Sequence, residues 1–263
     1  MPASGATSVF VSAPDGLRLH VRSYGAASRP ALPVVCLPGL ARTEADFQEL
    51  AAALSQNGGR PHRVIALDYR GRGQSDYDRN PFNYAVHIEL ADLQAVIAAL
   101  DCTPALFIGT SRGGILTMFL GAMRPTLIAG VVLNDIGPVI EPQGLVRIKS
   151  YVGRLPRPRD FGEGAEILRR LFSAQFPKLG PQDWQRAARR AFRQLDDGRL
   201  MPTYDSRIAK TMEGVDFERP LPPLWKEFDA LARVPLMVIR GENSDILSAA
   251  TVDAMRTRRS DMD

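Results

Sequence analysis

Apolar and polar positions alternate along the first 135 residues in a pattern that predicts strands separated by helices. Short apolar runs end at turn residues, and stretches with a helical period lie between the later runs. This alternation predicts a doubly wound, mostly parallel sheet with helices on both faces, an α/β fold. The predicted strands are residues 9–12, 17–24, 34–37, 63–67, 105–108 and 128–133, and the predicted helices are residues 44–55, 85–100 and 112–123.

Local signals refine these boundaries. Pro14, Asp15 and Gly16 separate the first two strands and predict a hairpin, so the sheet should open with an antiparallel pair. Thr43 is the expected N-cap of the helix at residues 44–55, and Pro125 closes the helix at residues 112–123.

The pattern becomes helical between residues 138 and 223, without a convincing buried strand. One stripe at helical spacing predicts a helix with one buried face; it consists of Trp184, Ala187, Ala188, Ala191, Phe192 and Leu195. A strand at residues 234–239 and a helix at residues 248–258 follow. We therefore expect a core domain in two parts, residues 1–137 and 224–263, with residues 138–223 inserted as a helical cap over the carboxyl ends of the strands, where such sheets bind ligands.

Composition is ordinary for a globular protein, with 45% apolar and 24% charged residues in 263. Two cysteines, Cys36 and Cys102, are too few for a disulfide framework and are expected to be buried thiols. The N-terminus lacks the pattern of an export signal, and no apolar stretch approaches the roughly 20 residues of a membrane span. These features predict a soluble, cytoplasmic protein without a membrane partner.

Positive charge is concentrated in one part of the chain. The formal net charge is +4, and residues 139–222 alone carry an excess of five positive charges. A solvated helical face whose arginine stems cover apolar surface explains this excess, and steering of an anionic small-molecule substrate is the alternative. No motif for nucleic acid accompanies it, so no nucleic-acid partner is expected.

Residues 109–113 read Gly-Thr-Ser-Arg-Gly between a predicted strand and a predicted helix. In this context Gly-x-Ser-x-Gly forms a tight turn that presents the serine as a nucleophile. Gly109 and Gly113 avoid clashes in the turn, while Ser111 is held at a strained backbone angle with its hydroxyl exposed. The segment therefore predicts a nucleophile elbow.

Two further motifs stand in order before the elbow. Residues 37–42 read Leu-Pro-Gly-Leu-Ala-Arg after the third strand, and residues 68–76 read Asp-Tyr-Arg-Gly-Arg-Gly-Gln-Ser-Asp after the fourth. With these motifs the chain resembles the α/β-hydrolase superfamily, in its cap-bearing branch with a serine nucleophile, which includes esterases, enol-lactonases and carbon–carbon bond hydrolases. The resemblance extends over nearly the whole chain, as far as Arg-Gly-Glu-Asn-Ser-Asp at residues 240–245.

The resemblance implies a role for each matching residue. Ser111 would attack an acyl carbonyl, and the backbone N–H groups of Leu40 and Arg112 would form the oxyanion hole. Asp245, after the seventh strand, matches the triad acid, with Asp135 after the sixth strand as the back-up acid. A loop-capping role is the alternative for Asp245.

The chain departs from the family pattern in its first loop. Many relatives have His-Gly there, whereas this chain has Pro38-Gly39, which leaves the backbone donor at Leu40 intact. Ser111 at the elbow excludes the aspartate nucleophile of haloalkane dehalogenases and epoxide hydrolases. Ester, lactone and carbon–carbon hydrolysis and perhydrolysis use the same residues, so the substrate and the oligomeric state are not predicted.

The triad base is missing from the predicted site. In the order Ser, acid, His, the base comes last, yet no histidine follows His87. His20, His62 and His87 are scattered, and we expect each to be an ordinary strand or surface residue. They offer no metal-ligand spacing, so neither a metal nor another cofactor is expected.

The expected explanation is truncation, because the predicted seventh strand lacks the neighbour that would lead to the histidine loop and is left as an unpaired edge. We therefore expect a serine hydrolase of small esters, lactones or related acyl compounds that acts through an acyl-enzyme, and little turnover by the 263 residues alone. The alternative is a non-catalytic module of this fold that binds a ligand or partner.

Overall fold

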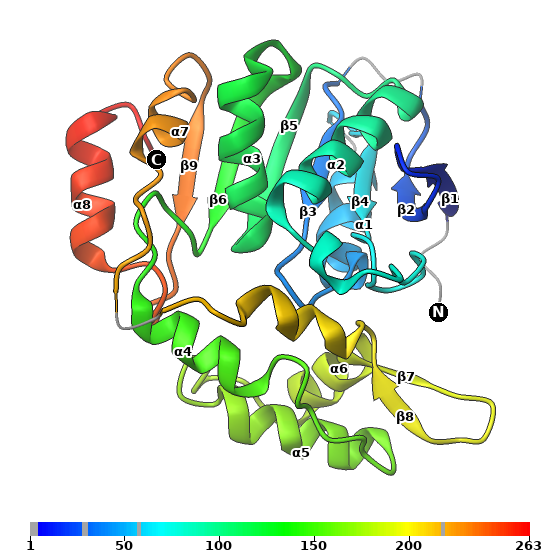
Figure 1. The fold of residues 1–263 in the computed structure, drawn as a ribbon. Coiled ribbons are helices and arrows are strands. Elements are labelled where there is room, and N and C mark those ends of the chain that lie inside the picture. Colours follow the sequence, from blue (N-terminus) through cyan, green and yellow to red (C-terminus); the bar gives the residue numbers. More distant parts are fainter. Residues whose placement is uncertain (1–4, 28–30, 57–58, 217–218) are drawn as a thin grey trace.

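The computed structural model describes residues 5–27, 31–56, 59–216 and 219–263, and a seven-stranded sheet runs through the molecule (Figure 1). The spatial order of its strands is β1-β2-β4-β3-β5-β6-β9. The bounds are β1 Ala6–Ser12, β2 Arg18–Tyr24, β3 Val34–Leu37, β4 Val64–Leu67, β5 Ala105–Thr110, β6 Ile128–Asn134 and β9 Leu236–Ile239.

The predicted strand directions are confirmed. β1 pairs with β2, and β2 with β4, in antiparallel register, whereas β3, β4, β5, β6 and β9 are parallel. The predicted hairpin joins β1 to β2, where the N–H of Gly16 donates to the carbonyl of Ala13 at 2.9 Å. All four residues of β3 and of β4 are buried, as expected for central strands covered on both faces.

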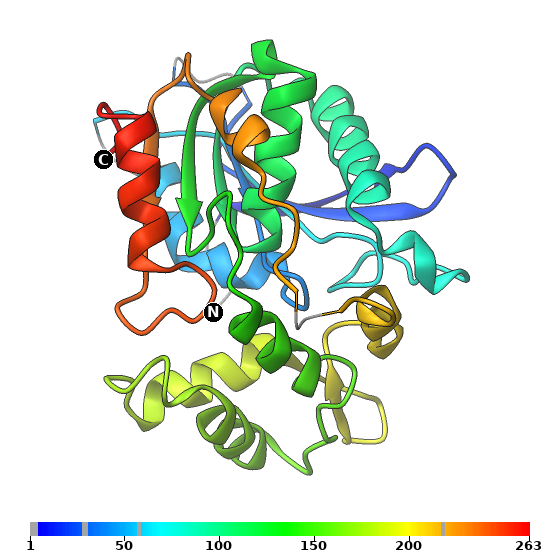
Figure 2. The same cartoon turned by 60° about the vertical axis from the view of Figure 1, so that its left-hand side comes forward.

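Helices cover the two faces unequally (Figures 1 and 2). α1 packs on one face, and α2, α3, α7 and α8 contribute to the apolar core on the other face. The bounds are α1 Gln48–Gln56, α2 Val86–Leu100, α3 Arg112–Met123, α7 Trp225–Asp229 and α8 Ala249–Arg258, with short 3-10 helices η1 Glu44–Phe47, η2 Pro81–Asn83 and η3 Pro125–Leu127.

Residues 142–212, here called the α4–η4 segment, lie beyond one end of the sheet (Figures 1 and 2). Backbone hydrogen bonds join this segment to the turn after β4. The N–H of Gly73 donates to the carbonyl of Thr203 and the N–H of Asp205 donates to the carbonyl of Gly71, each at 2.7 Å. The segment therefore lies at the carboxyl ends of the strands. Its elements are α4 Pro142–Tyr151, α5 Phe161–Phe172, α6 Pro181–Ala191, β7 Phe192–Gln194, β8 Leu200–Pro202 and η4 Ser206–Met212.

The pattern of this part of the chain indicates no convincing buried strand, and the structure has two short, mostly unburied strands there. The stripe through Trp184 is buried on α6 as predicted, but the helix ends at Ala191, and Phe192 begins the first strand of a hairpin. Asp-Asp-Gly at residues 196–198 supplies the turn, with Leu195 donating to Arg199 at 2.8 Å. Phe192 is buried as a strand residue. A buried residue at this position also fits the helical stripe, so the spacing alone does not distinguish a strand from a continued helix.

The predicted helix at residues 44–55 also differs in detail. It consists of η1 followed by α1, and the Thr43 side chain makes no capping hydrogen bond. The N–H of Glu44 donates instead to Oδ1 of Asp68 at 2.8 Å, so a carboxylate from the turn after β4 takes the place of the cap. By contrast, Ser248 caps α8 by accepting from the N–H of Thr251 at 3.2 Å.

On the α1 side, part of the sheet stays open. A hollow of about 260 Å³ lies over β5, β6 and β9, and Met237 and Ile239 of β9 are 43% and 48% exposed. The prediction of an unpaired edge at β9 was partly wrong, because Val238 donates to the carbonyl of Asp263 at 2.9 Å and Asp263 donates to Leu236 at 3.1 Å. No helix among the described residues has both the length and the apolar character needed to cross a membrane.

Candidate active site

Ser111 stands at the turn between β5 and α3 with φ 49° and ψ −109°. This backbone conformation is unfavourable for a residue with a side chain and persists only where its surroundings impose it. The N–H of Ser111 donates to the carbonyl of Asn134 in β6 at 3.0 Å, which fixes the turn to the sheet. The structure therefore places the predicted nucleophile in the strained turn that the motif requires.

The glycines of the elbow have no room for a side chain. A Cβ on Gly109 would lie 2.5 Å from the backbone nitrogen of Gly114, and one on Gly113 would overlap the carbonyl oxygen of Leu37 at the end of β3. α3 therefore begins in direct backbone contact with β3 and β5. This contact brings the start of α3 beside the loop that follows β3.

That loop carries Leu40, the first predicted oxyanion donor. The Tyr69 hydroxyl donates to the carbonyl of Pro38 at 3.2 Å, and Nε of Arg72 donates to the carbonyl of Leu40 at 2.8 Å. Leu40 and Tyr151 of α4 both pack against a small apolar cluster. Arg112 is the first residue of α3, where a backbone N–H has no partner within the helix.

A charged cluster that the sequence analysis missed lies behind these two residues. The Glu89 carboxylate accepts a hydrogen bond from Nε of Arg112 at 2.7 Å, and its other oxygen forms an ion pair with Nη1 of Arg72, also at 2.7 Å. Nη2 of Arg112 also donates to the carbonyl of Tyr84 at 3.1 Å. The sequence signals for this contact are the Arg-Gly-Arg motif at residues 70–72 and the acidic residue Glu89 in the first turn of α2.

Asp245 lies on the loop after β9, where Arg147 of α4 binds it through two nitrogens of its guanidinium group. Nε of Arg147 lies 2.5 Å from Oδ2 and Nη2 lies 2.7 Å from Oδ1 of Asp245. These bonds raise the pKa of Arg147. The predicted acid therefore has a cationic partner from the α4–η4 segment, which the sequence analysis did not foresee.

The back-up acid has a structural role in this conformation. Asp135 has φ 54°, and its Oδ1 accepts from the N–H of Gly241 at 3.1 Å. Its own N–H donates to the carbonyl of Ile239 at 2.7 Å. Asp135 thus joins the ends of β6 and β9.

The three histidines lie in separate places. His20 is fully buried between Asp68, 2.7 Å from its Nδ1, and Ser8, 3.0 Å from its Nε2. His62 bonds through Nδ1 to the carbonyl of Leu32 at 2.7 Å, and His87 is exposed on α2. In the described part of the chain none of them bonds to Ser111, and no group of three or more His, Cys, Asp or Glu side chains is arranged to hold a metal ion.

A second hollow, of about 290 Å³, adjoins the elbow on the α1 side. Pro38 of the Leu40 loop and Thr110 at the end of β5 border it, and Asp46 and Asn134 add polar groups. Asn134 Nδ2 donates to Oγ1 of Thr110 at 3.1 Å. The volume approaches the lower end of the range for small-ligand sites.

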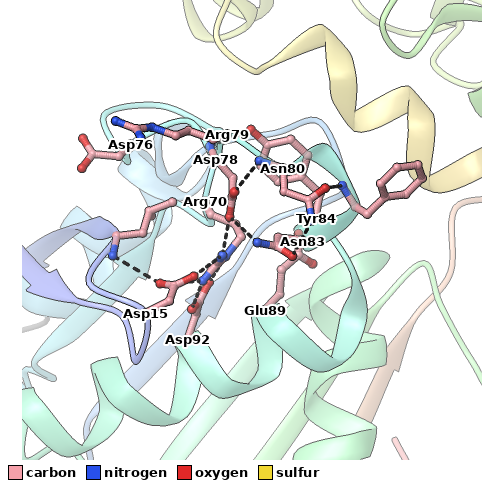
Figure 3. A network of polar contacts seen from close by, with 12 residues as sticks. Asp15, Arg70, Asp76, Asp78, Arg79, Asn80, Asn83, Tyr84, Glu89 and Asp92 are labelled. Atoms are coloured by element: carbon pink, nitrogen blue, oxygen red, sulfur yellow. Dashed lines mark hydrogen bonds and ion pairs between the residues drawn. The ribbon is translucent and has the colours of Figure 1, made fainter.

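Arg70 anchors the turn after β4 through three carboxylates (Figure 3). Its Nε and Nη2 each lie 2.6 Å from Asp92 of α2, and its Nη1 lies 2.6 Å from Asp78 and 2.9 Å from Asp15. The Arg70 and Asp92 side chains are each only 1% exposed. The bond from Arg70 lowers the pKa of Asp15, whereas burial raises the pKa of Asp92 despite this partner.

Most of this chain is similar to known proteins in sequence and in fold. The model of the alpha/beta hydrolase family matches residues 34–260. The 3-hydroxybutyrate-oligomer hydrolase of Cupriavidus necator is 31% identical over 95% of this chain and 86% of its own, and the 2-(acetamidomethylene)succinate hydrolase of Mesorhizobium japonicum is 26% identical over 94% and 82%. The crystal structure of an alpha/beta hydrolase from Novosphingobium aromaticivorans is similar with a TM-score of 0.89 and 40% identity, over 98% of this chain and 89% of that one.

These similarities extend over most of both partners and agree with the order of the motifs and with the topology of the sheet. The predicted fold class is confirmed. The chain belongs to the alpha/beta hydrolase family and is a hydrolase enzyme.

Proposed function

We propose that the protein is a serine hydrolase in which Ser111 attacks an acyl carbonyl and forms an acyl-enzyme. The observation that carries this proposal is the backbone of Ser111, with φ 49° between a strand and a helix. A serine held in that conformation presents its hydroxyl at the carboxyl end of the sheet. The N–H groups of Leu40 and Arg112 would stabilise the oxyanion, at about 3 to 4 kcal/mol for each donor.

Asp245 is the proposed acid of the triad, and Asp135 is the alternative acid. An acid in this position orients an imidazole, but His20, His62 and His87 all lie elsewhere. The 263 residues should therefore turn substrate over slowly, with a residual acceleration of about 10³ to 10⁴ over water from binding and the oxyanion hole.

We propose a small ester or lactone substrate that carries a free carboxylate. The names of two relatives denote substrates that share a carboxylate, an oligomer of a hydroxy acid and a substituted succinate. In this protein the guanidinium groups of Arg42 and Arg147 both act electrostatically on Tyr151, and they are paired with Asp46 and Asp245 respectively. The α4–η4 segment would thus act as a cap that supplies Arg147, while the loop after β3 supplies Arg42. The buried free thiols of Cys36 and Cys102 support a cytoplasmic location.

The test is intact mass after exposure to a fluorophosphonate probe, with and without imidazole in solution as a substitute base. The proteins are the unaltered chain, Ser111→Ala, and Ser150→Ala as the control, since Ser150 is an exposed serine of α4. We expect slow labelling that imidazole accelerates and that only Ser111→Ala abolishes.

Two other outcomes would change the conclusion. Fast labelling of Ser111 without imidazole would show that the chain is fully active and would refute the slow turnover. No labelling of a folded protein under either condition would refute the serine mechanism and favour a non-catalytic, ligand-binding module of this fold.

A further inference from the structure

One buried carboxylate connects the two predicted oxyanion donors. Glu89 lies at the start of α2, and its two oxygens each contact a different arginine at 2.7 Å, Arg72 through Nη1 and Arg112 through Nε. Arg72 in turn donates from Nε to the carbonyl of Leu40 at 2.8 Å. A continuous line of charged contacts therefore runs from Leu40 to Arg112.

The environment of this line is unusually dry for charged groups. The side chains of Arg72 and Glu89 are fully buried, and that of Arg112 is 14% exposed. The guanidinium of Arg72 lies 5.5 Å from the ring centres of both Tyr69 and Tyr84. Such a pair contributes little net stability, because desolvation offsets the attraction, so stability alone does not account for its presence.

This line of contacts joins two elements that are distant in sequence. Leu40 belongs to the loop after β3, and Arg112 begins α3 directly after Ser111. An oxyanion hole requires both N–H groups at 2.7 to 3.1 Å from one oxygen, so relative motion of the loop and the helix would weaken it. A hydrogen bond to the carbonyl of Leu40 at one end and a bond to the side chain of Arg112 at the other restrict that motion.

We propose that Glu89, through Arg72 and Arg112, positions the two oxyanion donors of this enzyme relative to each other. This inference rests on the proposed function, since it assigns Leu40 and Arg112 as donors. Glu89 does not touch the reacting atoms in this role and is a positioning residue. Its loss should slow acylation of Ser111 and leave the binding of substrate unchanged.

The first experiment reads the connection directly, by amide chemical shifts in NMR spectra. Arg112→Gln removes one end of the line, and we expect the amide of Leu40 to shift more than the amides of β3. Arg124→Gln, at the exposed far end of α3, is the matched control and should leave Leu40 unmoved. An unchanged Leu40 amide in Arg112→Gln overturns the inference.

The second experiment measures the rate at which the fluorophosphonate labels Ser111, in the presence of imidazole. For Glu89→Gln we expect the limiting rate to fall by about 10²-fold, as when one donor is lost, with the concentration for half-maximal rate unchanged. A higher probe concentration for half-maximal rate, with an unchanged limiting rate, would contradict the positioning role. If Glu89→Gln does not fold, Arg112→Gln serves for the same comparison.

The two experiments separate the two proposals. If Ser111 of the unaltered protein does not react at all, the serine mechanism fails, while the amide of Leu40 still decides whether the connection exists. If Ser111 reacts but the amide chemical shift of Leu40 is unchanged in Arg112→Gln, the serine mechanism stands and the role of Glu89 is refuted.

Discussion

Glu44, the first residue of η1, has a carboxylate whose ionisation should destabilise the folded protein. Its Oε2 is buried and has no hydrogen-bond partner among the described residues. Burial, and then repulsion from Asp68, raises the pKa of Glu44 from 4.5 to about 7. The neutral carboxyl is therefore the form that suits this site.

The sign of the pH dependence follows from that direction. A carboxyl whose pKa is higher in the folded than in the unfolded protein binds protons more tightly when folded. Its stabilising contribution is complete below about pH 4.5 and is lost as the pH rises through about 7. At about 1.4 kcal/mol per pKa unit, the shift from 4.5 to about 7 corresponds to a loss of roughly 3 kcal/mol at alkaline pH.

Glu44→Gln keeps the size of the side chain and removes the ionisation. We expect the variant to exceed the unaltered protein in free energy of unfolding by up to about 3 kcal/mol at pH 8, and this difference to vanish toward pH 4.5. Urea unfolding followed by circular dichroism at each pH measures it. Glu213→Gln, at an exposed position, is the control and should show no such trend. A difference that does not change between these pH values would refute the reasoning.

Two other predictions concern buried groups. Asp92→Asn weakens the pair that neutralises the buried Arg70 and should lower the free energy of unfolding by about 3 to 5 kcal/mol, whereas Asp76→Asn, at an exposed ion pair, should cost less than about 1 kcal/mol in the same urea titration. Burial raises the pKa of Cys36, and it raises that of Cys102 to about 11, so Ellman's reagent should modify the thiols only at the rate of unfolding; rapid modification of the folded protein would contradict their burial.

The sequence was sufficient for the sheet and the elbow because both depend on local rules. Apolar runs such as residues 34–37 and 64–67 are buried over their whole length, and such runs predict central strands without knowledge of their neighbours. The Gly-x-Ser-x-Gly turn likewise contains its own steric requirement, which the contacts of Gly109 and Gly113 display.

Partners that meet only in the folded protein could not be predicted. Charged residues usually lie at the surface, so a sequence does not indicate that Arg72 and Glu89 are fully buried. Arg147 and Asp245 are 98 positions apart, and the bond between them depends on how α4 meets the loop after β9. The motif therefore predicts where Asp245 lies along the chain, but not that Arg147 binds its carboxylate.

The open α1 side of β5, β6 and β9 affects how unfolding of this protein can be followed. Met237 and Ile239 expose apolar surface there, beside a hollow of about 260 Å³. Dyes such as ANS fluoresce on exposed apolar surface, which is why they report loosely packed states. This folded protein should already bind such a dye. A dye-based melting curve would therefore start from a high fluorescence signal and underestimate the amplitude of the unfolding transition. Circular dichroism, which reports the backbone, avoids that background.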